Sequence, residues 1–576
     1  MPHAAAASVG HGGADKVTVA DDTHMDMSQV IQAQQAAEAE KAMSLGQAMK
    51  HFHKGIMWSM LLSFALVMDG YDIVIINSFW GLPAFLNRFG EIDASGERYI
   101  SADWQAGLNN ANNVGNVIGL AINGFCQYRY GSRKTYIGGM LFMIGAIFIV
   151  VFAKDMPMLF GGELVCGIAW GIFQTLTTAY AAEICPLAVR AHLTSFVNIC
   201  WAMGLFIGAG VVRGTIGIDG DWGWRMPYVV QWVWPVPLIV VALFAPESPW
   251  WLVRKGRNED AKRSIARCAT AGYYSDEELN ARVALIEHTH ALEHAETKEQ
   301  SILNCFKGSN LRRTEIVCVV WAIQYWCGQP MTGYATEFFT QAGLSTSASF
   351  GLNLGNYAML LAGTILVWFC ERRPYPCGLC PGSTPLTARS NSVMGKLGRR
   401  TIYLAGQALM AVELGTMGIL GFFATNSNVS YGIGALMLIF NFTFACTVGP
   451  TCYTIVGELP ASEVRVQTVV LARMTYIVSG IINSQLTPRM ISNTEWGWGA
   501  RCGLFFLGTN LISFTYCYFR LPETKGRTFG ELDILFRNRV AARKFAETKV
   551  VEFETDIETP KSNFEEKPAE LQVESV

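Results

Sequence analysis

Two carboxyl groups and one guanidinium, each in an apolar stretch, are the residues of this sequence with the clearest chemistry. Asp69 and Asp72 lie three residues apart, so on a helix they share a face. Two carboxyl groups so near each other are costly to ionise together in a dry site, so the pair is expected to hold a proton near neutral pH. Arg473 carries the opposite charge, and pairing with an acid in only one of two conformations would tie protonation to conformation. The alternative is a static ion-pair network.

The composition indicates what kind of scaffold carries these residues. Of 576 residues, 51% are hydrophobic, 12% aromatic and only 16% charged, against about 25% charged in ordinary soluble domains. A net charge of −2 excludes a polycationic nucleic-acid surface, so no nucleic-acid partner is expected. The apolar fraction excludes disorder as the dominant state. A polytopic membrane protein in contact with lipid remains.

Stretches of about 20 mostly apolar residues predict membrane-spanning helices. Twelve such spans are expected: 56–79, 105–126, 135–153, 157–179, 192–212, 226–246, 315–338, 350–370, 401–423, 431–455, 467–488 and 501–519. Lys and Arg concentrate in alternate connections, which predicts that both termini are cytoplasmic. Inside the spans, Glu163 and Glu413 are assigned structural roles.

The spans divide into two groups of six. The expected parts are a cytoplasmic N-terminal tail (1–55, with a helix expected near 29–50), a six-helix bundle (56–246), a helical cytoplasmic loop (247–314), a second six-helix bundle (315–520) and a cytoplasmic C-terminal tail (521–576). The fold class is therefore an all-α polytopic membrane protein.

Three short motifs occur twice in the same order. GSRKTY at 131–136 matches GRRTIY at 398–403, EICPLAVR at 183–190 matches ELPASEVR at 458–465, and PESP at 246–249 matches PETK at 522–525. Offsets of 267, 275 and 276 residues indicate two parallel six-helix repeats, as in alternating-access transporters. Ion pairs among their charged residues are expected to hold the cytoplasmic side closed; the gating candidates are Arg133, Lys134, Glu183, Arg190, Arg399, Arg400, Glu458 and Arg465.

With these motifs the sequence resembles a known family. MDGYD at 68–72, CGIAWGIFQTL at 166–176, QWVWPVPL at 231–238, PESPWWLVRKGR at 246–257 and PETKGRTFGELD at 522–533 resemble the sugar porters of the major facilitator superfamily. Within them, the Trp-rich strings resemble the fungal maltose permeases, which are α-glucoside:proton symporters. The resemblance implies the major facilitator fold, a fungal plasma membrane location, and protons and a small-molecule sugar as partners.

For function, the resemblance implies import of α-glucosides such as maltose, coupled to protons through Asp69, Asp72 and Arg473. It also reveals a departure, because relatives often carry Glu in the second span where this chain has Asn116. Asn can bond a hydroxyl but does not titrate. Either coupling relies on the first-span acids or the protein is a facilitator. Transport of another sugar (sucrose, lactose or a hexose) and a role as a non-transporting sugar sensor stay open as well.

Sugar sites combine amides and hydroxyls with aromatic faces that stack on the sugar ring. Polar and aromatic residues inside the spans that fit this pattern are Gln174, Asn198, Trp201, Gln324, Gln329, Asn353, Asn356, Thr451 and Tyr453. Sugar porters resemble one another in using a span-seven Gln, which favours Gln324. For every candidate the alternative is hydrogen bonding between helices.

Residues 371–393 form a Pro-rich segment that is inserted relative to the family. It is interpreted as a disordered cytoplasmic insertion, with a retained intron as the alternative. Its single CGLC is weak evidence for zinc, which usually has four ligands. No metal site, cofactor or enzymatic activity is expected, since no nucleophile–base motif or phosphate loop stands out. The transporting unit is expected to be a monomer.

Overall fold

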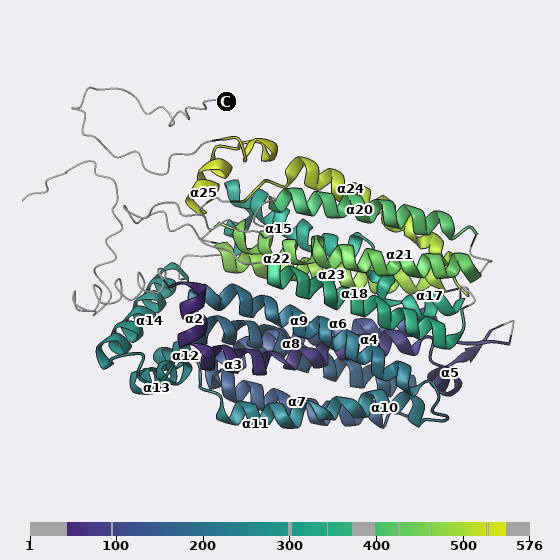
Figure 1. The fold of residues 1–576 in the computed structure, drawn as a ribbon, viewed down its shortest axis with the longest axis horizontal. Coiled ribbons are helices and arrows are strands. Elements are labelled where there is room, and N and C mark those ends of the chain that lie inside the picture. The colour runs from purple at the N-terminus through teal and green to yellow at the C-terminus, as the bar shows by residue number, and fades with distance from the viewer. Residues whose placement is uncertain are drawn as a thin grey trace, which may run out of the picture.

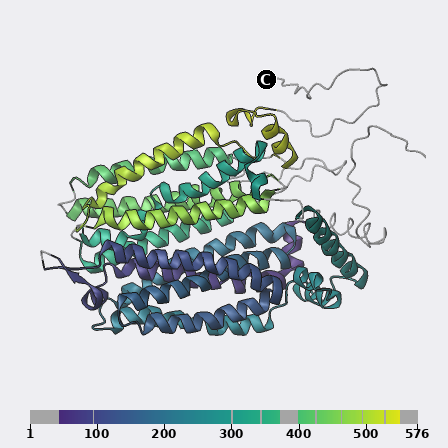
Figure 2. The ribbon, with the colours of Figure 1, turned by 180° about the vertical axis from the view of Figure 1, so that it is seen from behind.

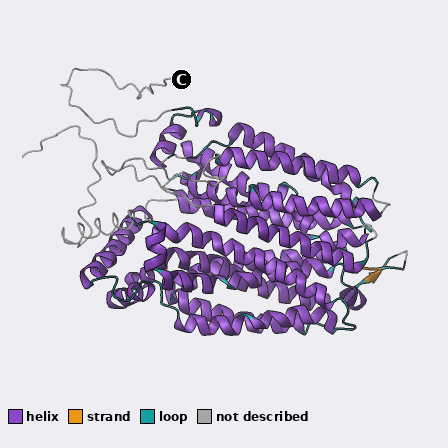
Figure 3. Cartoon of the chain, in the orientation of Figure 1, coloured by secondary structure: helices purple, strands orange, loops and turns teal. Residues whose placement is uncertain are grey.

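Two helical bundles lie side by side in the computed structural model, the N-terminal one purple to teal and the C-terminal one green to yellow (Figure 1). The structure describes residues 43–548 except 94–95, 298–301, 342–343, 371–397, 424–426, 462–463, 493, 526 and 528. The predicted insertion and most of both predicted tails lie outside these residues. Nearly all of the described chain is helical (Figure 3).

The first bundle contains six spans. They are α3 and α4 (His53–Ser63 and Ala65–Phe79), α6 (Ala102–Tyr130), α7 (Ser132–Val151), α8 (Met156–Ile184), α9 (Leu187–Thr215), and α10, η1 and α11 together (Trp222–Val230, Gln231–Val233 and Pro235–Phe244). The short helix α2 (Leu45–His51) precedes them. Helix α5 (Pro83–Phe89) and the antiparallel strands β1 (Glu91–Ile92) and β2 (Arg98–Tyr99) connect α4 to α6.

The second bundle repeats this plan. Its spans are α15, α16 and α17 (Gly308–Trp326, Gln329–Gly333 and Ala335–Gln341), α18 (Thr346–Cys370), α20 (Arg399–Leu420), α21 and α22 (Ser427–Cys446 and Val448–Glu458), α23 (Arg465–Ile491), and η4 with α24 (Gly499–Arg501 and Cys502–Arg520). Helices α12 (Pro249–Arg254), α13 (Asn258–Cys268), α14 (Asp276–Thr297) and η2 (Ile302–Phe306) join the bundles, and α25 (Phe529–Arg537) and η5 (Ala542–Lys544) follow them.

The twelve-helix prediction is confirmed within the described residues. Ten helical segments are long and apolar enough to cross a membrane. The other two spans are the second and the seventh. Helix α6 is rich in Asn, and the seventh span breaks at Gly328, which has a φ of 100° that favours glycine. Helix α6 is continuous, and only the seventh span has a break, at the buried Gly328, where such backbone is tolerated inside the protein.

The two ends of the molecule differ in character. Helices α12–α14 lie at one end, and α5 with the β1–β2 hairpin lies at the other (Figures 1 and 2). The Lys/Arg bias predicts that the α12–α14 end is cytoplasmic. We call these ends the predicted cytoplasmic end and the predicted extracellular end. In the N-terminal tail, helix is described only from Leu45, within the predicted helix at 29–50.

Close backbone packing fixes the helix that carries the two aspartates. A Cβ added to Gly204 on α9 would lie 2.0 Å from the Val67 carbonyl oxygen, and one added to Gly70 on α4 would lie 2.1 Å from the Trp201 carbonyl oxygen. The backbones of α4 and α9 therefore touch, which only glycine permits at both positions. Between the bundles, α6 contacts α23 and α9 contacts α18.

Candidate functional site

Asp72 lies fully buried among uncharged hydrogen-bond donors from three other elements. Its carboxylate accepts hydrogen bonds from Asn112 Nδ2 on α6 at 3.1 Å, from Trp170 Nε1 on α8 at 3.0 Å and from Gln231 Nε2 on η1 at 2.7 Å. Buried polar groups need such partners, because an unsatisfied one costs about 1–3 kcal/mol. The sequence identified Asp72 but none of these three donors as its neighbours.

Asp69 has a different environment, which reaches the other bundle. Its Oδ2 accepts a hydrogen bond of 3.1 Å from Gln174 Nε2 on α8. The other end of that amide, Gln174 Oε1, accepts a hydrogen bond of 2.6 Å from Arg473 Nη2 on α23. One side-chain amide therefore links an acid of the first bundle to the guanidinium of the second. Asp69 and Arg473 do not form a direct ion pair in this structure.

An aromatic group surrounds the Arg473 guanidinium. Arg473 Cζ lies 4.9 Å from the ring centroid of Tyr476 and 5.6 Å from that of Trp321. Tyr325 packs on Tyr476 with centroids 4.6 Å apart, and Tyr453 packs on Trp321 at 5.9 Å. Tyr453 nevertheless keeps 47% of its surface exposed, so one side of this group remains accessible. We call these four rings the aromatic group.

Of the aromatic group, only Tyr453 was among the candidates from sequence. The signal for two others was present, because WAIQYW at 321–326 places Trp321 and Tyr325 four residues apart on one helix face. Tyr476 follows Arg473 by three residues on α23, which also places the two on one face. Spacing alone does not show which face of a span lies between the bundles.

The remaining sugar-binding candidates divide into two sets. Asn353 donates to Ser78 Oγ at 3.3 Å, and Asn356 donates to the Thr332 carbonyl at 3.4 Å, so these two make hydrogen bonds to other helices, as the alternative interpretation expects. Gln324 and Thr451 are buried, while Asn198, Trp201 and Gln329 are half-buried.

In each bundle, residues of the first repeated motif make equivalent hydrogen bonds to the glutamate of the third. In the first, the Arg133 backbone N–H donates to Glu247 Oε1 at 3.1 Å, and the Arg133 guanidinium donates to the Leu243 carbonyl. Burial raises the pKa of Glu247, which lies in the connection after α11. Ser248 next to it lies beside Glu183.

In the second bundle, the backbone N–H groups of Arg399 and Arg400 donate to Glu523 at 2.8 and 3.2 Å. The Arg400 guanidinium donates to the Tyr518 carbonyl at 2.8 Å, as Arg133 does to Leu243. Glu458 pairs with Arg399 at 3.1 Å and accepts from Thr524 at 2.8 Å. Each of these contacts lies inside one bundle. The gating role of the motif residues stays a prediction.

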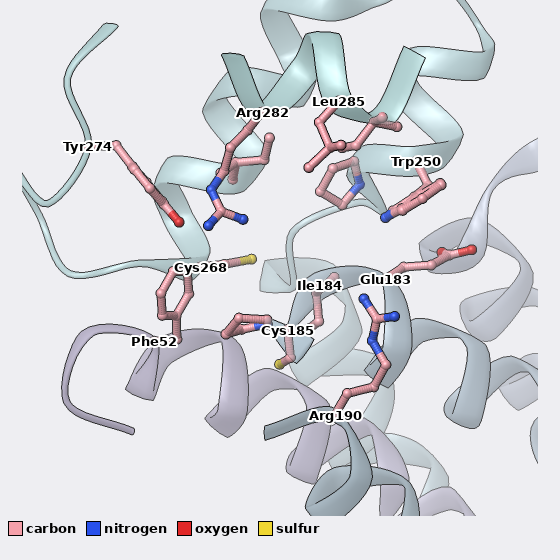
Figure 4. Close-up of a pocket in the computed structure, with 14 residues that line it drawn as sticks. Phe52, Glu183, Ile184, Cys185, Arg190, Trp250, Cys268, Tyr274, Arg282 and Leu285 are labelled. Carbon is pink, nitrogen blue, oxygen red and sulfur yellow. The ribbon is translucent and has the colours of Figure 1, made fainter. Parts of the chain in front are cut away.

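Two more gating candidates line a cavity of about 80 Å³ at the predicted cytoplasmic end. Glu183 and Arg190 lie at the junction of α8 and α9, and Arg282 enters from α14. Both arginine side chains point into this space, with Glu183 beside Arg190 (Figure 4). Of the other two candidates, Lys134 is exposed and Arg465 is half-buried at the beginning of α23.

Contacts between the bundles also occur near the predicted extracellular end. Asp103 on α6 pairs with Arg489 on α23, and Asn109 Nδ2 donates to Tyr334 Oη at 2.9 Å. At the predicted cytoplasmic end, Trp368 Nε1 donates to the His192 carbonyl at 3.0 Å. The sequence did not single out these residues, because their partners are hundreds of positions away.

Comparison with known proteins identifies the scaffold. Residues 58–375 and 386–536 match the sequence profile of the family described as sugar (and other) transporter. The chain belongs to this family. The match leaves out residues 376–385, which lie inside the predicted insertion 371–393.

Relatives and solved structures agree with this membership. A general alpha-glucoside permease of Saccharomyces cerevisiae is 37% identical over 533 residues, covering 92% of this chain and 82% of the relative. A maltose permease of the same organism is 36% identical over 547 residues, covering 92% and 85%. The inward-open xylose transporter XylE of E. coli, 19% identical, shares the fold with a TM-score of 0.63 over 83% of this chain and 98% of that one. The protein is a multi-pass membrane transporter of sugars and not an enzyme.

Proposed function

We propose that this sugar transporter imports α-glucosides such as maltose across the plasma membrane, by alternating access coupled to proton entry. The names of the permeases that it resembles support the substrate class. In this proposal the bundles at 56–246 and 315–520 move against each other, and a single chain is the transporting unit. The tails and the loop at 247–314 lie in the cytoplasm.

The observation that carries the proposal is the amide link between Asp69 and Arg473. Gln174 joins an acid of one bundle to a cation of the other, so a change of charge at Asp69 acts directly on a contact between the bundles. Alternating access requires such contacts to form and break. Proton uptake by the first-span acids then favours one arrangement, and proton release favours the other.

Coupling has a thermodynamic purpose here, because an uncharged sugar does not accumulate by itself. One proton that moves down a membrane potential of 100 mV releases about 2.3 kcal/mol. At about 1.4 kcal/mol per decade, this supports roughly a fifty-fold sugar gradient.

The sugar is expected to bind beside this link. Tyr453 contributes an accessible ring, and Gln324 and Thr451 lie on the same helices as members of the aromatic group. We assign sugar contacts to Tyr453, Gln324, Thr451 and the half-buried Gln174. The other polar candidates (Asn198, Trp201, Gln329, Asn353 and Asn356) are proposed to shape the same site.

A facilitator without proton coupling is the second candidate, and Asn116 is the observation that favours it. Asn116 lies half-buried on α6, and its backbone carbonyl packs against Gly171 of α8. It offers no titrating group at this position.

The test is uptake of labelled maltose in cells that lack their own α-glucoside transporters, with the pH of the medium recorded at the same time. Uptake with alkalinisation that is lost in Asp72→Asn supports the symporter. Uptake without alkalinisation supports the facilitator. No uptake of maltose or of other offered sugars by protein at the cell surface contradicts both and favours a sensor.

A further inference from the structure

Glu163 is a fully buried carboxyl group to which the proposed function gives no role. It lies on α8, near the end that begins at Met156. Its Oε1 accepts a hydrogen bond of 2.7 Å from Tyr228 Oη on α10. Its Oε2 is also buried, and among the described residues no donor reaches it with good geometry. A structural glutamate usually has both oxygens satisfied, so this one invites another explanation.

A second acid lies beside Glu163. The Glu163 carboxyl group lies beside the Asp72 carboxyl group and the Asn112 amide. Ionised carboxylates only accept hydrogen bonds, so two of them can bond only when one carries a proton. The donors already assigned to Asp72 are neutral amides and an indole, and none of them balances a second negative charge.

Among the residues that the structure describes, the other titratable groups around this pair do not supply a positive charge. Asp69 lies one turn away on α4, Cys166 lies on α8, and Tyr71 and Tyr228 contribute phenols. Arg473, the guanidinium of this site, is held at the Asp69 side by Gln174. A buried pair of carboxyl groups without a neighbouring cation holds a proton between them.

We propose that Glu163 and Asp72 form a carboxyl pair that shares one proton, and that this pair loads and releases the transported proton. This inference rests on the proposed proton coupling and adds its binding site. In the loading step, an O–H bond forms at one carboxyl group of the pair. In the release step, the same bond breaks and the proton leaves on the other side of the membrane.

The pair also explains how coupling survives with Asn116. Asn112, one turn before Asn116 on α6, donates directly to Asp72. Position 116 of α6 has no carboxyl group, but the adjacent helix α8 supplies one, that of Glu163, within one turn of α6 from Asn116. Helices α6 and α8 are held close enough for this by glycines, since a Cβ at Gly115 would lie 2.2 Å from the Leu164 carbonyl oxygen.

Helix α8 connects this pair to the link between the bundles. Glu163 and Gln174 are eleven residues apart, which is about three helical turns, so they lie on the same face. When the pair loses its proton, the two carboxylates repel and α8 and α4 are pushed apart. That strain acts on the helix whose Gln174 holds Arg473 of the other bundle.

The experiment compares Glu163→Gln, Glu163→Asp and a control variant in proteoliposomes. Glu413→Gln is the matched control, because Glu413 is a buried carboxyl group that accepts from one hydroxyl, Thr443 Oγ1 at 2.8 Å, but lies in the other bundle. Labelled maltose is followed in two assays. One is accumulation driven by an imposed pH gradient over a range of external pH, and the other is exchange at equal pH, which needs no net proton movement.

For Glu163→Gln we expect accumulation near neutral pH to fall by about tenfold or more, and half-maximal accumulation to require a more acidic medium. Exchange stays within about threefold of wild type, Glu163→Asp keeps much of the pH profile, and Glu413→Gln behaves as wild type. An infrared band of a buried protonated carboxyl group in wild type should be absent from Glu163→Gln.

Three results would overturn the inference. If Glu163→Gln accumulates maltose with the same extent and pH profile as wild type, the pair does not carry the proton. Equal loss of exchange and accumulation in both Glu163 variants shows a structural role. Wild type that exchanges maltose but accumulates none under the gradient refutes proton coupling itself, and the inference falls with it. Wild type that accumulates maltose under the gradient keeps the proposed coupling even if the carboxyl pair is refuted, so failure of this inference and failure of the proposed function are distinguishable.

Discussion

Substitutions of Gln174 and of Arg473 should slow transport through the loss of the same contact, so their effects should not add. Gln174→Leu keeps the approximate volume of the side chain and removes both hydrogen bonds, to Asp69 at 3.1 Å and from Arg473 at 2.6 Å. Only the bond with Arg473 crosses between the bundles. A hydrogen bond to a charged group contributes about 1.5–3 kcal/mol net. At about 1.4 kcal/mol per decade, its loss should lower the rate of gradient-driven uptake by about 10- to 100-fold.

A double-mutant cycle tests this reasoning. If Gln174→Leu and Arg473→Leu remove the same contact, the double variant should be no slower than the slower single variant. Gln407→Leu provides the control, because Gln407 is a buried glutamine on α20, a helix that carries none of the linked residues, and its effect should multiply with that of Arg473→Leu. The assay is the initial rate of labelled maltose uptake into proteoliposomes under a fixed pH gradient. Fold-losses that multiply for Gln174 and Arg473 would refute the link.

Three further outcomes are expected. Trp321→Ala and Tyr476→Ala should each raise the KM for maltose by about 2- to 10-fold, because both rings pack in the aromatic group that contains Tyr453 and each loss of packing costs about 0.5–1.5 kcal/mol. The measurement is uptake over a range of maltose concentrations, and an unchanged KM would show that the substituted ring does not support the sugar site. Glu523→Gln removes the charge that accepts from three backbone N–H groups and should destabilise the protein by about 1–3 kcal/mol, seen as a lower midpoint in thermal unfolding; an unchanged midpoint would show that these hydrogen bonds do not stabilise the fold. Arg489→Gln should change uptake by less than about fivefold, because Asp103 is 78% exposed and such pairs contribute about 0.2–1 kcal/mol; a larger loss would show that this contact controls opening.

The spans could be predicted from sequence because the signal is local. Each depends on the hydropathy of about 20 consecutive residues, and even the seventh span, which breaks at Gly328, keeps enough apolar residues for detection. The duplicated motifs were also informative. Glu247 and Glu523 occupy equivalent places in PESP and PETK, and each accepts backbone N–H bonds at the beginning of the third span of its bundle.

The neighbours inside the site could not be predicted in the same way. Sequence pointed to Asp69 and Asp72 as a pair because they are close in the chain, yet their hydrogen-bond partners differ completely. Glu163 was assigned a structural role because it lies near the predicted exterior end of its span, and its partner Tyr228 is 65 residues away in sequence. Which acid lies next to which depends on the rotation and register of α4 against α8, and this is fixed by packing across the whole bundle.

The register of α4 against α8 also explains why Asp69 and Asp72, one turn apart, have different neighbours. Helices α4 and α8 run antiparallel, so the earlier residue of α4 meets the later residue of α8. Asp69 meets Gln174, and Asp72 meets Trp170 and Glu163. The acid nearer the predicted extracellular end thus has a second carboxyl group, and the acid nearer the predicted cytoplasmic end has the link to Arg473. In the proposed mechanism, a proton that enters from outside reaches the carboxyl pair first, and the change it makes in α8 passes to the contact between the bundles. A shift of one helical turn in α8 would break both pairings.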